Sequence, residues 1–378
     1  MREGIKNLLF IIALATIPVF LVWLPFFLRL SEFWNIPLPP QGMATIVANY
    51  DGPLYIVVAK TFYNIEAIKT NYQFPLPAEY YSSHFPLFPL LIRLFSYPLG
   101  FPYAMLFVTV TSSILCLYYF HKLTNSYWLT FVFSILPARF LVVRSIGSPE
   151  PLFLAAIIAS VFYFTKKKYW LSGIFGAMAV ATKSPGILLF VAYFLYLVGP
   201  KIKDLVTKKL TNVLASVEWK TFPIFLMPLS LLSVFVLYKF IFNDFFAYFH
   251  SGDNIHLLLL PFQIFNYSAP WVGTFWLEET IFIYLFGALG LISLIKQKQN
   301  LLACVYGVFF ATIIFVSHRD LLRYSLPMLP FFYVAFSKYL ETKEFKIVLT
   351  FLIIPIYLFS LAFISQNVMP ISDWRPFL

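Results

Sequence analysis

Asp51 is the residue of this sequence with the clearest potential for chemistry. It stands in a Tyr50-Asp51-Gly52 corner, where a polar loop turns into an apolar segment. A carboxylate in such a corner, at a membrane boundary where lipid-linked substrates present their head groups, is a candidate for a functional role, and the glycine beside it could let a substrate approach the backbone closely. The alternative is an ordinary helix cap, which contributes about 0.5–2 kcal/mol and is the common role of an isolated Asp in a turn.

The composition decides what kind of structure must position this residue. Of the 378 residues, 61% are hydrophobic and only 11% are charged, and the mean hydropathy is +0.82. A soluble domain usually carries roughly 25% charged residues, so this chain has too little polar surface to cover itself in water. These values exclude an ordinary soluble protein and predict an all-α polytopic membrane protein in a single domain, residues 1–378.

Apolar runs along the chain predict about eleven transmembrane helices, with a range of nine to thirteen. Each run is compared with the ~20 residues that cross a hydrocarbon core, and several are short by that standard. The expected spans are 8–30, 100–120, 128–143, 152–164, 169–182, 186–199, 221–242, 281–295, 301–317, 326–337 and 347–364.

The net charge of +11 follows from the orientation of these spans. With the N-terminus in the cytoplasm, the inner loops hold most of the Lys and Arg and carry the whole excess, as the positive-inside rule expects. No nucleic-acid partner is needed to explain the charge. Four of the five His fall on the outer side, so chemistry is expected on the extracytoplasmic face.

Two outer segments are much longer than the others, residues 31–99 and 243–280. The first contains two apolar stretches that are poor spans, because 53–65 carries Lys60 and 85–99 begins among prolines and carries Arg93. Both are expected to be interfacial helices that cap the outer membrane face. Cys116 and Cys304 fall within expected spans and are interpreted as packing residues.

Five short motifs together resemble a known family. They are NYDGPLY at 49–55, HFPLFPLLIR at 84–93, SPEPLFL at 148–154, TKSPG at 182–186 and RYSLPMLP at 323–330. In this order and on the outer side, they resemble the GT-C glycosyltransferases, with the closest likeness to the second mannosyltransferase of glycosylphosphatidylinositol synthesis and its prokaryotic relatives. The likeness covers about 50–330. This chain has Tyr50 where that family typically has Trp.

The resemblance implies a GT-C fold and a polyprenyl-phosphate-dependent hexosyltransferase, with mannose as the donor sugar. Asp51 would be the general base that accepts the proton of the acceptor hydroxyl as its oxygen attacks the anomeric carbon, with inversion. A phosphate leaving group needs no general acid, so one carboxylate suffices. The acceptor, a lipid, glycan or peptide, is left open.

A phosphate leaving group also requires fixed cations that stabilise its charge. The basic residues on the outer side are the candidates for this role. Arg323 is the first choice and Lys183 the second, although either could be a snorkelling anchor at a helix end. Arg139 and Arg144 are expected to face a cavity or to pair with acids such as Glu150. Glu150 itself is expected to be either an ordinary first-turn acid or a group that orients a substrate hydroxyl or a basic partner. The other expected substrate-binding residues are Tyr50, Gly52, His84, His318, Asp320 and Tyr324, with Asp320 as the rival for the role of base.

No cofactor or metal is expected, since the outer segments lack an HxxxH or DxD pattern. The competing function is a transporter or flippase of lipid-linked sugars, for which paired broken helices and ionisable residues at the bilayer midplane are typical. A noncatalytic membrane scaffold is the third hypothesis for its function. In a prokaryote the protein would lie in the plasma membrane among its lipids, with its site on the extracytoplasmic side.

Overall fold

The computed structural model describes residues 2–72, 74, 76–199, 218–252, 256–266, 268 and 274–378. Nearly all of the regular structure in these ranges is helical. The exception is one short antiparallel hairpin of β1 (Glu32–Phe33) and β2 (Ile36–Pro37). The all-helical fold expected from the composition is therefore confirmed.

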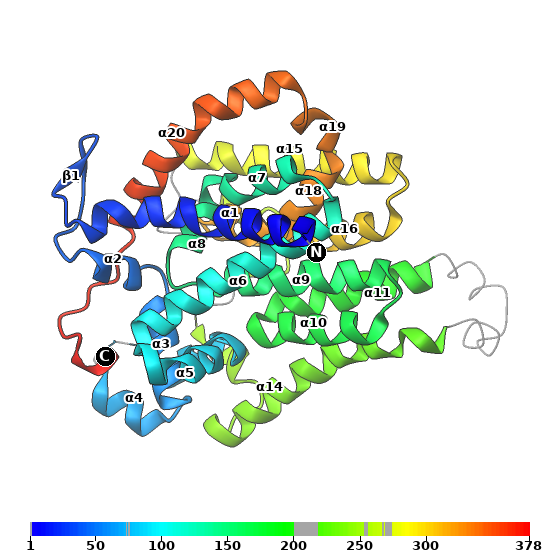
Figure 1. The fold of residues 1–378 in the computed structure, drawn as a ribbon. Helices are drawn as coiled ribbons and strands as arrows, with labels where there is room; N and C mark the ends of the chain where they lie inside the picture. Colours follow the sequence, from blue (N-terminus) through cyan, green and yellow to red (C-terminus); the bar gives the residue numbers. More distant parts are fainter. Residues whose placement is uncertain are drawn as a thin grey trace.

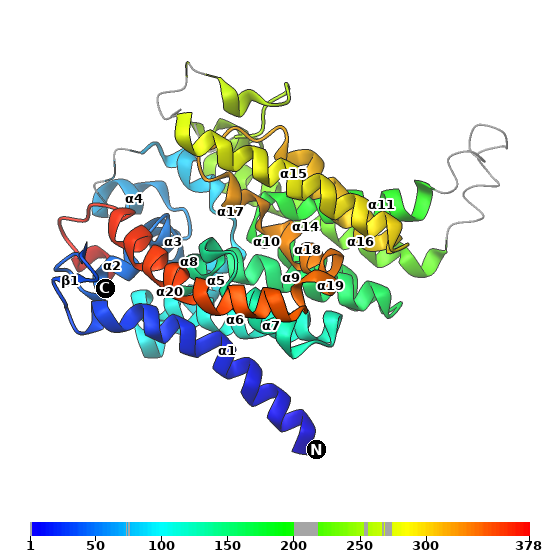
Figure 2. The same cartoon turned by 90° about the horizontal axis from the view of Figure 1, so that it is seen from above.

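Five helices in these ranges are long and apolar enough to cross a membrane. In Figure 1 most of the long helices run in roughly the same direction, and Figure 2 shows α1 and α20 along one flank and α15 along the other. This supports a membrane protein by length and composition. The five segments lie in α1 (Arg2–Phe27), α6 (Phe101–Thr124), η4 with α14 (Trp219–Phe225 and Leu226–Phe242), α15 (Thr274–Lys296) and α20 (Lys343–Gln366).

The expected span 128–143 is not one helix. It is divided into α7 (Tyr127–Ile135) and α8 (Ala138–Ser145), which are bent by 74°. Pro137 has no amide hydrogen and disfavours helical backbone at Leu136, which is extended here (φ −119°, ψ 139°). Counted as one broken span, this pair raises the number of candidate crossings to six.

The other expected spans correspond to shorter elements. Five apolar helices have 10–17 residues, fewer than the ~20 that cross a bilayer unaided. The expected span 326–337 is also in pieces, beginning with η8 (Leu326–Met328) and α18 (Leu329–Ala335). The shorter apolar helices are α5 (Leu87–Leu99), α9 (Glu150–Thr165), α10 (Tyr169–Thr182), η2 with α11 (Ser184–Gly186 and Ile187–Val198) and α16 (Asn300–Ile313).

The segment 31–99, expected on the outer side, forms short helices at one end of the bundle, close to the C-terminus (Figures 1 and 2). α3 (Gly52–Thr61) begins with a proline in its first turn and ends at Phe62, whose backbone is left-handed (φ 48°). All residues from Gly52 to Ala59 are buried. The helix at 53–65 was expected to lie in the membrane interface, but it is shorter and enclosed by the protein, because its apolar residues occupy every face. The neighbouring elements are α2 (Met43–Val47), α4 (Ile65–Asn71) and η1 (Ala78–Ser83).

Two apolar clusters hold the bundle together. The first joins α3, α5, α6 and α8 to α1 and α20, and the second joins α9, α10, α11, α16 and α18. α9 contributes to both and packs on α6 and α10. The start of α9 therefore lies where the two clusters meet. The remaining short elements are η5 (Ala247–His250), η7 (Gln263–Phe265), α17 (Leu321–Ser325), α19 (Ser337–Leu340) and η9 (Arg375–Phe377).

Candidate functional site

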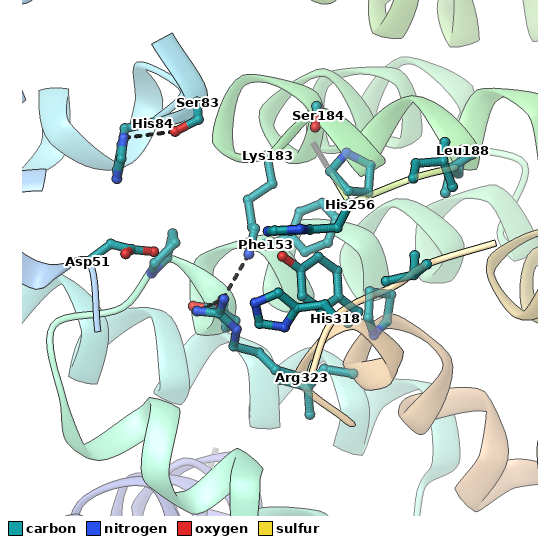
Figure 3. A pocket seen from close by; sticks show the side chains of 18 of the residues that line it. Asp51, Ser83, His84, Phe153, Lys183, Ser184, Leu188, His256, His318 and Arg323 are labelled. Atoms are coloured by element: carbon teal, nitrogen blue, oxygen red, sulfur yellow. Dashed lines mark hydrogen bonds and ion pairs between the residues drawn. The ribbon is translucent and has the colours of Figure 1, made fainter. Parts of the chain in front are cut away.

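A cavity of about 430 Å³ lies where chain segments from across the sequence meet. Figure 3 shows Asp51 entering it from one side and Lys183, His256, His318 and Arg323 from the other. All five motifs singled out in the sequence contribute to its wall. The expected site residues that line it are Tyr50, Asp51, His84, Glu150, Lys183, His318, Arg323 and Tyr324.

Asp51 occupies the N-cap position of α3, but its side chain does not cap the helix. No hydrogen bond or ion pair joins its carboxylate to any residue in the described ranges, and it lies partly exposed in the cavity wall. The structure thus removes the ordinary explanation of this Asp as a cap. It leaves a carboxylate with both oxygens available to a ligand.

Gly52 does not line the cavity, contrary to the expectation that it admits substrate to the backbone. A Cβ atom here would lie 2.6 Å from the carbonyl oxygen of Val47 and 3.3 Å from that of Gly147. The glycine is required because two backbone segments pack closely at this point. This packing brings Asp51 beside the 147–150 segment that carries Glu150.

Glu150 is buried and holds two cations in the cavity wall. Its Oε1 lies 2.8 Å from Lys183 Nζ and 3.8 Å from Arg323 Nη1, and Ser148 Oγ hydrogen-bonds to its other oxygen. The Lys183 side chain is 28% exposed to solvent, whereas the Arg323 side chain is only 14% exposed. Lys183 is therefore the more accessible cation. Glu150 therefore orients two basic residues, Lys183 and Arg323.

Asp320 binds a second set of partners and is not in the cavity wall. Its carboxylate lies 3.2 Å from Arg139 Nε and 3.5 Å from Arg323 Nε, and it accepts a 2.7 Å hydrogen bond from the Tyr50 hydroxyl. Burial and this nearby carboxylate raise the pKa of Tyr50, so the hydroxyl keeps its proton and donates it. Because these three groups occupy its carboxylate and it does not line the cavity, Asp320 is a weaker candidate for the base than Asp51.

His84 is buried and lines the cavity beside Asp51. Its ring packs edge-on against Tyr55 at 4.7 Å, and its Nδ1 lies 3.1 Å from Ser83 Oγ. Burial lowers the pKa of His84, so the imidazole is neutral at pH 7. Tyr80 also lines the cavity, with its ring 6.0 Å from that of His84, so this part of the wall has neutral hydrogen-bonding groups.

His318 forms a ring pair with His256, a residue not singled out from the sequence as a site residue. The two ring centroids lie 4.4 Å apart, and both side chains line the cavity. His318 Nδ1 accepts a 2.9 Å hydrogen bond from the amide of Asp320. Burial and the charges of His256 and Arg323 lower the pKa of His318 to about 3, which keeps it neutral.

Arg144 neither faces the cavity nor pairs with Glu150, contrary to expectation. It is fully buried, and its guanidinium donates to the backbone carbonyls of Ser134, Leu14 and Ala15. These carbonyls satisfy the charge without a carboxylate. The Arg of α8 that does reach the site's ion pairs is Arg139.

No group of three His, Cys, Asp or Glu suited to a metal ion occurs among the residues that the structure describes. The expectation of metal independence remains a prediction. Cys116 and Cys304 are free thiols, the first of them buried.

The fold is that of a helical membrane protein, and it contains a charged, partly enclosed cavity. Comparison of the chain with models of known protein families and with curated protein sequences finds no match. The resemblance to GT-C enzymes therefore depends on the five motifs and on the residues that they bring together.

Proposed function

We propose that this protein is a membrane glycosyltransferase of the GT-C type, which moves a sugar from a polyprenyl-phosphate donor to an acceptor. The observation that carries the proposal is the cavity in which Asp51, a carboxylate with no hydrogen bond or ion pair to any described residue, faces the cations Lys183 and Arg323. A base and an anion-binding pair in one enclosed space are what such a transfer requires.

The charge of the ion-paired cluster fits the phosphodiester head group of a lipid-linked sugar. Arg139, Lys183 and Arg323 form ion pairs with two carboxylates, Glu150 and Asp320, so this cluster has one positive charge more than it has paired carboxylates, and Asp51 faces it from across the cavity. A sugar linked to a lipid through one phosphate carries one negative charge. In the low dielectric of a buried site, this match favours such a donor.

The reaction proposed is a direct displacement at the anomeric carbon. Asp51 accepts the proton of the acceptor hydroxyl as that oxygen forms a bond to the carbon, and the bond from the carbon to the phosphate oxygen breaks. The electron pair leaves with the lipid phosphate, where Lys183 and Arg323 stabilise its increased negative charge. Attack from the side opposite the leaving group inverts the anomeric centre.

The acceptor hydroxyl would bind on the His84 side of Asp51. The wall there offers a neutral imidazole and the hydroxyls of Ser83 and Tyr80. With the acceptor bound there and the phosphate bound at Arg323 and Lys183, Asp51 would lie between the two substrates. Mannose as the donor sugar comes from the family resemblance, and the acceptor is a lipid, glycan or peptide.

The proposal extends to the fold and its orientation. A GT-C arrangement with about eleven crossings needs the shorter apolar helices to span the bilayer together with their polar ends. The distribution of Lys and Arg would place the N-terminus in the cytoplasm and the cavity on the extracytoplasmic side.

The second candidate, a transporter or flippase, is favoured by one observation, the 74° bend between α7 and α8. Transporters typically have two broken helices in corresponding positions, whereas a single broken helix is found in the described ranges. The ionised groups of the cavity lie instead on loops and at helix ends. This arrangement suits a fixed active site better than a transport path.

The decisive experiment is transfer of mannose from short-chain polyprenyl-phosphate mannose to a panel of lipid, glycan and peptide acceptors. Asp51→Asn should stay folded and lose about 10² to 10⁴-fold in kcat, since it removes only the base. Asp244→Asn is the matched control, because Asp244 pairs with His250 outside the cavity. Full activity of Asp51→Asn would refute the assignment, and movement of the intact donor across vesicles without transfer would favour the flippase.

A further inference from the structure

The backbone just before Asp51 is clamped to the far end of the chain. Met369 donates its amide hydrogen to the carbonyl of Ala48 at 2.7 Å, and Asn49 and Val368 form an antiparallel bridge. The segment 367–378 leaves α20 and runs back along the short helices at this end of the bundle (Figure 1). Residues near the end of the sequence thus touch the corner that carries the candidate base.

Asn49 is the centre of this clamp. Its side chain is fully buried and uses both ends of its amide. Nδ2 donates to the carbonyls of Ile364 at 2.7 Å and Thr45 at 3.3 Å, and Oδ1 accepts from Asn367 Nδ2 at 3.2 Å. One side chain therefore joins α2 to the last turn of α20 and to the segment that follows it.

The next residue, Tyr50, needs such support. Its φ of 48° is left-handed, a conformation that non-glycine residues adopt only where the surroundings hold them. Its ring lies 5.6 Å from that of Phe363, which also packs under the Arg139 guanidinium at 3.7 Å. The end of α20 thus supports the corner through both the Asn49 amide and the Tyr50 ring.

We propose that Asn49 is a positioning residue, which fixes Asp51 in the cavity wall by clamping residues 48–50 to residues 363–369. Asn49 is not in the cavity wall, so it acts only through its neighbours. Its effect on catalysis rests on the proposed function, whereas its effect on the position of residue 51 does not. The two can therefore be measured separately.

The first measurement needs no enzyme activity. In a full-length chain with Cys116→Ala, Cys304→Ala and Asp51→Cys, the reaction rate with a small water-soluble methanethiosulfonate reports the position of residue 51. Asn49→Asp has nearly the same shape but replaces the donor with an acceptor facing two carbonyls, and it should change this rate at least fivefold. Asn71→Asp, which removes a similar bond on the exposed side of α4, should leave the rate within twofold. An unchanged rate in Asn49→Asp overturns the clamp.

The second measurement uses the chain with Asp51 intact and native cysteines. Asn49→Asp should lower kcat at least tenfold while the donor KM changes less than threefold, because Lys183, the more accessible of the proposed phosphate-binding cations, is held by Glu150 on a separate segment. A labelling change with unaltered kcat overturns the positioning role. A labelling change in a protein that transfers no sugar even as wild type refutes the proposed function and leaves the clamp in place.

A second variant covers the case in which Asn49→Asp does not fold. Met369→Pro removes only the amide hydrogen bond to Ala48 and leaves the Asn49 side chain in place. It lies after the last long helix, so the bundle should stay assembled. The same changes in labelling and in kcat are expected, and wild-type values for both in folded Met369→Pro overturn the proposal.

Discussion

Tyr50 donates its hydroxyl hydrogen to Asp320 Oδ2 across 2.7 Å, although 270 positions separate the two residues. The same hydroxyl accepts a 2.9 Å hydrogen bond from Arg139, and the Arg323 guanidinium lies 4.6 Å from the centre of the Tyr50 ring. The residue before the candidate base thus contacts the candidate phosphate-binding cation and the carboxylate that holds it. A tryptophan, typical of the resembled family at this place, has no hydroxyl and could not make these bonds.

Replacing Tyr50 by Phe should lower kcat about tenfold without removing the ring. The change deletes a hydrogen bond to a charged group, worth about 1.5–3 kcal/mol, and Arg323 loses part of the support for its position. Steady-state transfer kinetics and the melting temperature would measure the two effects. Tyr357→Phe is the matched control, since that hydroxyl binds the carbonyl of Leu21 outside the cavity. Equal activity of the two variants would contradict a role for the Tyr50 hydroxyl.

Replacing Glu150 by Gln should strengthen the binding of a lipid phosphate. Glu150 is the counter-ion of Lys183 and Arg323, so it competes with any anion for the same two cations. Removing its charge while keeping its shape should lower the inhibition constant of a short-chain polyprenyl phosphate about tenfold, equivalent to about 1.4 kcal/mol. Stability should fall, because two cations lose a buried partner.

The control for this prediction is Glu66→Gln, an exposed residue of α4 outside the cavity. It should leave both the inhibition constant and the melting temperature unchanged. Weaker binding of the lipid phosphate to Glu150→Gln would mean that the anion binds elsewhere. The same inhibitor must then be tested on Lys183→Ala, which removes the more accessible cation.

Much of the fold could be predicted because a chain that folds in lipid must be unusually rich in apolar residues. Apolar runs located the long helices, and their composition allowed no other class of structure. The lengths were harder to predict, because a run of apolar residues has the same appearance whether a helix crosses lipid or is enclosed by protein. The segment of α3 was expected to lie in the membrane interface but is enclosed by the protein, and Pro137 divides a run that is continuous in hydropathy.

The sequence predicted most of the residues of the site, but it did not predict which cation pairs with which carboxylate. Ionisable residues are scarce in this chain, so those on one side were good candidates, and most of them line one cavity. Which cation meets which carboxylate depends on helix rotation. Arg139 and Arg144 are five residues apart on α8, which places them about 140° apart around the helix. One therefore reaches Asp320 and the other turns into the core, and nothing in the sequence decides which.

Replacing Arg144 by Met should destabilise the protein without altering its chemistry. The guanidinium is fully buried and satisfies three backbone carbonyls, which would lose their donors. Each unsatisfied buried group costs about 1–3 kcal/mol, so the melting temperature should fall clearly. The kcat of the protein that remains folded should match the wild type. Arg93→Met, an exposed Arg of α5, is the control for loss of an Arg, and a fall in kcat at an unchanged melting temperature would place Arg144 in the site after all.

Acid should destabilise the protein through His318. The pKa of this residue is about 3 in the folded protein, below the value of about 6.5 expected for an unfolded chain. Between these two values the unfolded state binds more protons, so the contribution of His318 to stability is complete above pH 6.5 and is lost as the pH falls toward 3. His318→Asn keeps an acceptor for the Asp320 amide but does not titrate. The melting temperature of this variant should therefore fall less between pH 7.5 and pH 5 than that of the wild type. His250→Asn, a change at an exposed His outside the cavity, should follow the wild type. If the melting temperature of His318→Asn falls as much as that of the wild type, the acid sensitivity arises from another group. Protonation of His318 would then not be the cause of the lost stability.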